Sequence, residues 1–148
     1  MSFSVDVNVL LYASTAGSPL HERATEFLSE CRSGPDLFCL GWPTLMAYLR
    51  MVTHPGIVSP PLLPRQAEEN IGSLVGLPNV RLLAEQEGFW ELYRQTTRDV
   101  VVRGKLVPDA HLATLLRQHG VRTLYSNDRD FRKFDFLDLR NPFDAAGR

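Results

Sequence analysis

The sequence has few cysteines and no clustered histidines, which limits the metal and disulfide chemistry open to it. Its two cysteines, Cys31 and Cys39, are too far apart for a CxxC motif, and its four histidines are scattered along the chain. This pattern excludes a zinc knuckle and a disulfide framework. We therefore expect both cysteines to be free thiols that pack in the core.

The chain also lacks a long apolar run and a large net charge. No apolar stretch approaches the roughly 18 residues of a membrane-spanning helix, and no basic segment precedes an apolar run at the N-terminus. Lysine and arginine number 16 against 17 acidic residues, for a net charge of -1. A site for a polyanion would therefore have to be local. We expect a cytoplasmic protein that makes no contact with membranes.

Apolar segments typical of strands alternate with segments typical of helices. A chain of 148 residues with 44% hydrophobic residues predicts one domain over residues 1–148. Strands are expected at 3–7, 36–41, 79–83, 121–126 and within 137–143. Helices are expected at 8–15, 18–34, 42–56, from about 64 to 76, 85–104 and 107–120, with a short one within 127–134. This alternation predicts an α/β fold with a mainly parallel sheet covered on both faces.

Four aspartates occupy positions where such a sheet would bring them together. Asp6 interrupts the apolar run FSVDVNVLLYA where the first strand ends, Asp109 lies in the first turn of a helix, and Asp128 and Asp130 follow the fourth strand. Taken singly, Asp109 is an ordinary helix-start residue and Asp128 an ordinary turn former. Parallel sheets bind ligands beyond the carboxyl ends of their strands, so we expect these side chains to converge there.

Convergence of these carboxylates would require a compensating charge or protons. At about 5 Å and an effective dielectric constant near 20, each pair of like charges costs roughly 3 kcal/mol. Either the groups take up protons, or a cation lies among them. Hard oxygen ligands without cysteine or clustered histidine favour Mg²⁺, with Mn²⁺ as a substitute, over Zn²⁺. The pattern therefore indicates metal-dependent hydrolysis of a phosphodiester.

The segments VDVNVLLYA, PDAHLATLL and SNDRDF, in this order, resemble the PIN-domain nucleases, and in particular the VapC-type toxins of bacterial toxin–antitoxin pairs. The segments LRMVTHPGI and LRNPF strengthen the resemblance, which runs from about Phe3 to Phe143. It implies a three-layer α/β/α sandwich around a short, mainly parallel sheet. It also implies a Mg²⁺-dependent endoribonuclease that cleaves RNA and is inhibited by a cognate antitoxin protein.

The resemblance also assigns roles to individual residues. By position, Asp6 and Asp109 would be the main metal ligands, Asp128 would complete the acidic pocket, and Asp130 would lie close by. The catalytic set would further include Asn8 and Ser126, at positions where polar side chains orient carboxylates or waters.

The chain departs from the family pattern at Ala47. Most members of the family carry a glutamate in the helix after the second strand, whereas TLMAYLRM places an alanine there. We therefore expect one tight metal site rather than two.

The surroundings of the acidic residues leave several roles open. Arg50 lies one helical turn from Ala47, where it would either hold a phosphate or remain solvated. Arg129, Arg132 and Lys133 would form either a basic lip for RNA or an ordinary solvated face. The apolar segment 42–51 would serve as core, as an antitoxin groove or as the contact of a homodimer.

Two other functions remain open from the sequence. DVNVL also resembles the first motif of haloacid-dehalogenase-type phosphatases, in which Asp6 would be the nucleophile. That chemistry normally needs an acid two residues later, and Asn8 cannot supply a proton. A PIN-like module that binds a partner or RNA without catalysis is the second alternative, and Ala47 favours it.

Overall fold

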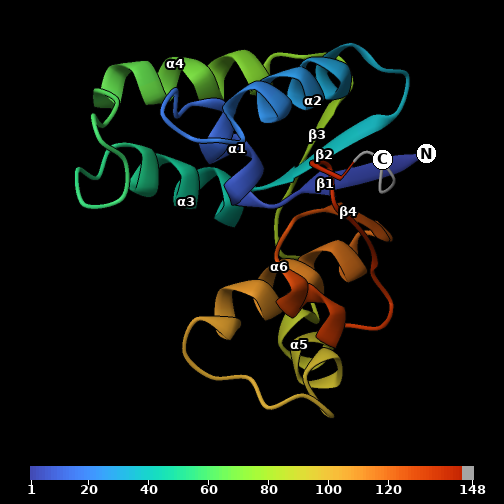
Figure 1. Ribbon diagram of the computed structural model, residues 1–148. Coiled ribbons are helices and arrows are strands. Elements are labelled where there is room, and N and C mark those ends of the chain that lie inside the picture. The colour runs from blue at the N-terminus through green and yellow to red at the C-terminus, as the bar shows by residue number, and fades with distance from the viewer. Residues whose placement is uncertain (145–148) are drawn as a thin grey trace.

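The computed structural model describes residues 1–144, which form a five-stranded sheet between two layers of helices (Figure 1). The strands are β1 (Ser2–Val5), β2 (Leu37–Gly41), β3 (Val80–Leu83), β4 (Thr123–Tyr125) and β5 (Asp138–Arg140). Their order in the sheet is β3-β2-β1-β4-β5, and all neighbouring pairs are parallel. The predicted α/β/α sandwich with a short parallel sheet is confirmed.

The helices divide between the two faces of the sheet. One face carries α1 (Val7–Ala13), α2 (His21–Ser33), α3 (Trp42–Val52) and α4 (Pro64–Val75) (Figure 1). The other face carries α5 (Phe89–Thr96), α6 (Leu106–Gln118) and the short 3₁₀ helix η1 (Arg129–Lys133). Each layer buries its own apolar cluster against the sheet.

Strand β2 shows how one sheet serves both layers. Phe38 and Leu40 pack into the cluster beneath α1 to α4, whereas Cys39, between them, packs into the cluster around α6. All three are buried, as expected of a parallel strand covered on both sides. Cys31 and Cys39 are both buried free thiols, as predicted.

Two helix predictions were wrong in their extent. We predicted that Ser18 and Pro19 begin a helix, but α2 begins at His21, because the Ser18 carbonyl accepts from His21 N–H (3.1 Å) in a preceding turn. The helix predicted over 85–104 is only α5. It ends at Thr96, and the hydroxyl of the next residue, Thr97, donates to the Tyr93 carbonyl (2.9 Å). The β-branched run Val100–Val102 that follows disfavours further helix.

The order of the strands reverses between β1 and β4. From β1 the chain proceeds outward to β2 and β3, and then returns to place β4 and β5 on the opposite side of β1. Val5 is in register with Tyr125, and the Asp6 amide donates to the Tyr125 carbonyl (3.0 Å). The residues that follow these two strands therefore meet at one edge of the sheet, where open parallel sheets bind ligands.

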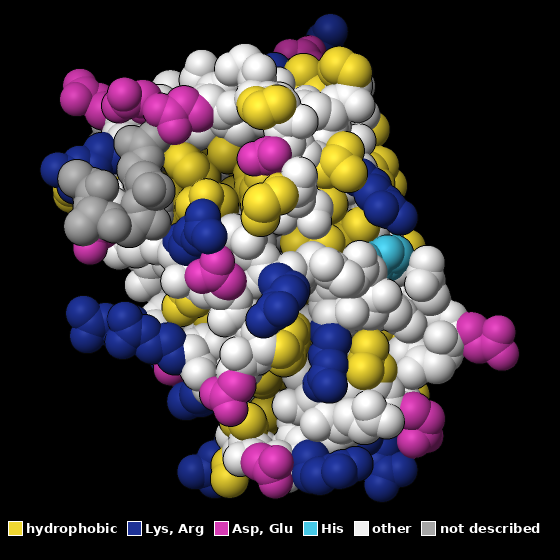
Figure 2. All heavy atoms as spheres, turned by 90° about the vertical axis from the view of Figure 1, so that its right-hand side faces the viewer, with side chains coloured by type: hydrophobic (Ala, Val, Ile, Leu, Met, Phe, Trp, Pro, Cys, Tyr) yellow, Lys and Arg dark blue, Asp and Glu magenta, His cyan; other side chains and the backbone are white. Residues whose placement is uncertain are grey.

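Charged side chains of both signs are interspersed on the face shown in Figure 2, on the side of the N-terminus. Basic and acidic groups alternate there with apolar ones, in keeping with the net charge of -1. No helix among residues 1–144 is long and apolar enough to cross a membrane.

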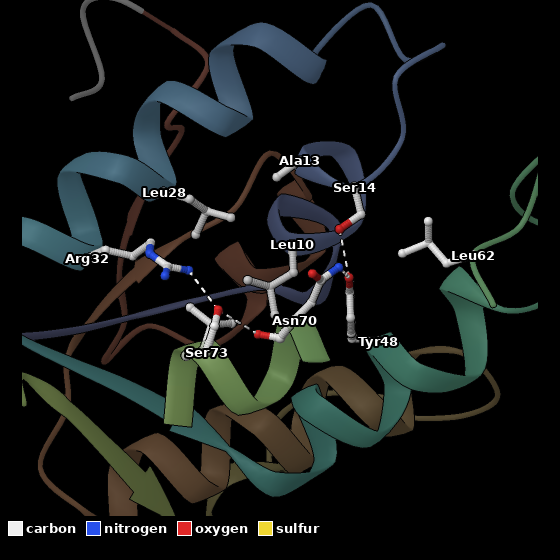
Figure 3. Close-up of a pocket in the computed structure, with 10 residues that line it drawn as sticks. Leu10, Ala13, Ser14, Leu28, Arg32, Tyr48, Leu62, Asn70 and Ser73 are labelled. Atoms are coloured by element: carbon white, nitrogen blue, oxygen red, sulfur yellow. Dashed lines mark hydrogen bonds between the residues drawn. The ribbon is translucent and has the colours of Figure 1, made fainter. Parts of the chain in front are cut away.

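A cavity of about 240 Å³ lies among α1, α2, α3 and α4 (Figure 3). The hydroxyl of buried Tyr48 projects toward it and is hydrogen-bonded to the Ser14 hydroxyl (2.7 Å) and to the Asn70 amide nitrogen (2.9 Å). Arg32 Nη1 donates to the Ser73 hydroxyl (3.2 Å) across the same cavity. These bonds link three helices and a helix end, so the polar groups of the cavity hold the layer together.

Candidate metal centre

Asp6 is held rigidly where β1 meets α1. Its side chain is 6% exposed, and its Oδ2 accepts a hydrogen bond from the Ser126 hydroxyl (2.9 Å) and a longer one from Asn8 Nδ2 (3.4 Å). Burial raises the pKa of Asp6 above its usual value, and the hydrogen bonds from Ser126, the Val7 backbone and Asn8 oppose that rise. The position is therefore that of an oriented, poorly solvated carboxylate.

Asp109 lies in the first turn of α6 and is half-buried. Its pKa is raised from 3.8 to about 7, first by burial and then by the charges of Asp128, Asp6 and Asp130. A carboxyl whose pKa lies near neutrality for these reasons is typical of functional sites. Without a cation, the carboxyl would therefore hold a proton about half of the time at pH 7.

The loop between β4 and η1 presents two further carboxylates. The Ser126 hydroxyl that donates to Asp6 also accepts from the Asp128 amide (3.0 Å), and Asp128 Oδ1 accepts from the Asp130 amide (2.9 Å). Asp128 thus caps η1, which agrees with its ordinary role as a turn former. Asp130 Oδ1 also pairs with Lys133 Nζ (3.6 Å).

Three carboxylates meet closely enough to share one cation. Oxygens of Asp109, Asp128 and Asp130 all lie within 4.8 Å of one another. Asp6 adjoins this group, because its charge raises the pKa of Asp109 and the charge of Asp128 raises that of Asp6. The close cluster therefore consists of Asp109, Asp128 and Asp130, with Asp6 beside it. The resemblance implied a ligand set of Asp6, Asp109 and Asp128 with Asp130 only close by, so Asp130 lies nearer to the centre than expected.

The donor set fits a hard divalent cation. The cluster offers only carboxylate oxygens, the ligands that Mg²⁺ and Mn²⁺ prefer, and half-burial of its members makes mutual repulsion hard to screen. Asp6, oriented by Ser126 and Asn8, lies beside this set and raises the pKa of Asp109 through its charge, but it is not one of the three carboxylates whose oxygens lie within 4.8 Å of one another. These carboxylates therefore suit the Mg²⁺ or Mn²⁺ ion that the sequence led us to expect.

From the sequence, Lys105 was considered only as the motif lysine of the phosphatase alternative and was not connected with the acidic cluster. Lys105, at the start of α6, lies four residues before Asp109, and its charge lowers the pKa of that carboxyl. The i, i+4 spacing on a helix was the available signal. Lys105 forms no ion pair with another residue in the range 1–144.

Other nearby residues lie outside the acidic cluster. His111, two residues after Asp109, turns away and bonds Glu85 (2.5 Å). Ala47 is half-buried on α3, and exposed Arg50 forms no ion pair within the described part of the chain.

No protein-family model matches the chain, but curated relatives do. Ribonuclease VapC48 of Mycobacterium tuberculosis is 46% identical over 143 residues, which cover 97% of this chain and 99% of the relative. Ribonuclease VapC43 of the same organism is 31% identical over 141 residues, or 95% of each chain. This chain belongs to the VapC ribonucleases. It is accordingly a nuclease that hydrolyses RNA, which favours this function over the phosphatase alternative.

Solved structures of VapC proteins share the fold. Mycobacterium tuberculosis VapC20, described as a toxin that cleaves the sarcin–ricin loop, superposes with a TM-score of 0.69 at 18% identity, over 93% of this chain and 98% of that one. VapBC2 from Rickettsia felis, bound to a DNA fragment from its promoter, gives a TM-score of 0.66 at 14% identity, over 95% and 98%. The PIN-domain architecture expected from the sequence is thereby confirmed.

Proposed function

We propose that this VapC protein is a Mg²⁺-dependent endoribonuclease and the toxin of a type II toxin–antitoxin system. The observation that carries the metal dependence is the meeting of Asp109, Asp128 and Asp130 within 4.8 Å at the carboxyl edge of the sheet, beside Asp6. A folded chain gains little from crowding four carboxylates unless a cation compensates them. Hydrolysis of a phosphodiester is the chemistry that such a cation serves in a nuclease.

In this proposal Asp6, Asp109 and Asp128 hold the Mg²⁺, which Mn²⁺ can replace, and Asp130, whose carboxylate lies within 4.8 Å of those of Asp109 and Asp128, adds a further oxygen ligand. The cation, when bound, supplies an acidified water and neutralises charge that develops on the phosphate. Ser126 and Asn8 fix the Asp6 carboxylate, so that its oxygens need little reorganisation when substrate arrives.

The protonation of Asp109 and the charge of Lys105 both affect how the site binds the cation and the RNA. Asp109 ionises near neutral pH, so at lower pH its carboxyl must lose a proton before it can serve as a ligand. Lys105 favours the ionised form of Asp109. The same ammonium lies at the rim of the site, where it can neutralise part of the charge of the RNA backbone.

An antitoxin partner is supported by the structural neighbours. Several of them are complexes named VapBC, including VapBC-1 from Haemophilus influenzae, which gives a TM-score of 0.66. We propose that this chain is likewise inhibited by a cognate antitoxin, and that both act in the cytoplasm.

The experiment that tests the proposal compares the wild type with Asp109→Asn and with Asp135→Asn, a matched change at an exposed aspartate outside the cluster. Purified wild type should cleave RNA with Mg²⁺ and lose activity in EDTA. Asp109→Asn should be inactive by at least about a hundredfold, since a cation ligand is lost. Asp135→Asn should retain activity.

Expression in cells tests the biological role. Wild-type protein should arrest growth, co-expression of the antitoxin should restore it, and Asp109→Asn should be harmless. If wild type, Asp109→Asn and Asp135→Asn are all harmless and none of them cleaves RNA, the non-catalytic binding module is the correct alternative.

A further inference from the structure

A second polar pocket adjoins the acidic cluster on the side of β5. It measures about 150 Å³ and is lined in part by Asn127, Asp128, Arg129, Arg132 and Asn141. Asp128 belongs both to this pocket and to the carboxylate cluster. Because Asp128 is shared, a ligand in this pocket would lie next to the RNA phosphate that the carboxylate cluster is proposed to hydrolyse.

The side chains in this pocket have unused hydrogen-bonding capacity. Neither Arg129 nor Arg132 forms an ion pair within residues 1–144. Asn141 uses its Oδ1 to accept from the Phe143 amide (2.9 Å), which leaves its Nδ2 donor available. Two guanidinium groups and an amide are thus free to bind a polar ligand.

The mixed lining of the pocket suits a polar heterocycle. Two guanidinium groups, from Arg129 and Arg132, line it together with amide, carboxylate and apolar side chains. Bases of single-stranded RNA are read by hydrogen bonds to their edges and by stacking on guanidinium planes. Leu139, also in the lining, adds an apolar surface of the kind that a base ring covers.

We propose that this pocket receives the nucleobase adjacent to the scissile phosphate and that Arg129 and Arg132 determine which base is accepted. The inference rests on the proposed RNA cleavage and names a specificity subsite for it. Guanine is the expected base, because its O6 and N7 atoms match the paired donors of an arginine.

A pool of single-stranded RNAs with randomised positions tests this assignment. The 5′ and 3′ ends left by wild type, Arg129→Ala and Arg132→Ala are sequenced. Wild type should prefer one base at the position beside the cut. Each variant should reduce that preference by roughly fivefold or more and leave the preferences at other positions unchanged, since a bidentate arginine contact discriminates by about this factor.

Arg122→Ala is the matched control, because Arg122 is an exposed arginine at the opposite end of β4. It should leave the base preference as in wild type. An unchanged preference in both pocket variants overturns the proposal. A uniform loss of rate across all sequences also overturns it, since that result is expected of backbone contacts alone.

A binding measurement separates this inference from the proposed function. On an Asp109→Asn background, fluorescence anisotropy compares short RNAs that differ only at the position beside the cut, or, if no cleavage is seen, at each position in turn. Loss of base discrimination upon Arg132→Ala supports the subsite even if the protein cuts no RNA. Equal affinities for all RNAs, with or without Arg132, overturn it.

Discussion

The Ser126 hydroxyl donates a hydrogen bond to Asp6 Oδ2 across 2.9 Å, although 120 residues separate the two along the chain. The same hydroxyl accepts the Asp128 amide, so one oxygen joins the end of β1 to the loop that carries two acidic side chains. A single serine thus bonds both the Asp6 carboxylate and the backbone of the loop that carries Asp128 and Asp130.

Ser126→Ala should therefore weaken metal binding and RNA cleavage by about tenfold to a hundredfold, the usual effect of removing a group that orients a ligand. Ser4→Ala is the control, because Ser4 is also buried but donates to the Cys39 carbonyl (2.6 Å) instead of to the acidic site. Both variants should lose stability. Equal loss of Mn²⁺ affinity in the two, measured by calorimetry, would contradict a special role for Ser126.

The stability of the metal-free protein should fall as the pH rises. The pKa of Asp109 is about 7 in the folded state against 3.8 ordinarily, so between these values the folded chain binds more protons than the unfolded chain. The free energy of unfolding therefore decreases from about pH 4 through pH 7. Asp109→Asn cannot ionise, so in EDTA at pH 8 it should unfold at a higher temperature than wild type.

Asp135→Asn serves as the control for this measurement and should retain the wild-type slope between about pH 5 and pH 8, on either side of the folded-state pKa of Asp109. A wild-type slope in Asp109→Asn would show that other groups cause it. Added Mg²⁺ should raise the melting temperature most at high pH, because binding competes with the proton on Asp109.

Lys105→Gln should shift metal binding to higher pH. Removal of this ammonium removes the one basic group that lowers the pKa of Asp109, so the carboxyl would ionise later and bind Mn²⁺ more weakly at pH 7. Arg103→Gln removes the same charge from an exposed residue in the same loop and should have a smaller effect. Titrations with Mn²⁺ at several pH values distinguish the two.

Mn²⁺ titration should also reveal one tight site per chain. Ala47 supplies no ligand at the position where the family resemblance implies a glutamate, and the close cluster in residues 1–144 comprises three carboxylates with Asp6 alongside. Two fully occupied ions in the anomalous scattering of crystals soaked in Mn²⁺ without RNA would contradict this.

Tyr48→Phe should lower the free energy of unfolding by about 1–3 kcal/mol, since Asn70 and Ser14 both lose a partner in a partly buried region. Urea denaturation measures the change. The acidic cluster lies elsewhere, so cleavage of RNA under native conditions should be unchanged. A large loss of activity at full folding would link this cavity to catalysis.

The order of strands and helices could be predicted from the sequence, because buried parallel strands are short apolar runs and because proline and glycine mark the helix ends. The convergence of Asp6, Asp109 and Asp128 could be anticipated since strand ends share one edge of a parallel sheet. The extent of α5 could not, because the segment 85–104 was taken as one helix although α5 ends at Thr96 and the β-branched run Val100–Val102 disfavours its continuation. The effect of the Lys105 charge on the pKa of Asp109 was also not predicted, because it depends on how the start of α6 is oriented.

The order of the strands along the chain means that the acidic cluster can form only late in translation. Its first carboxylate leaves the ribosome with β1, but Asp128 and Asp130 come after β4, when most of the 148 residues have been made. The sheet must then insert β4 beside β1 before the carboxylates meet. In the proposed mechanism, a chain that is still being translated therefore carries Asp6 and Asp109 without the loop that completes the cluster, so cleavage of RNA requires nearly the whole molecule.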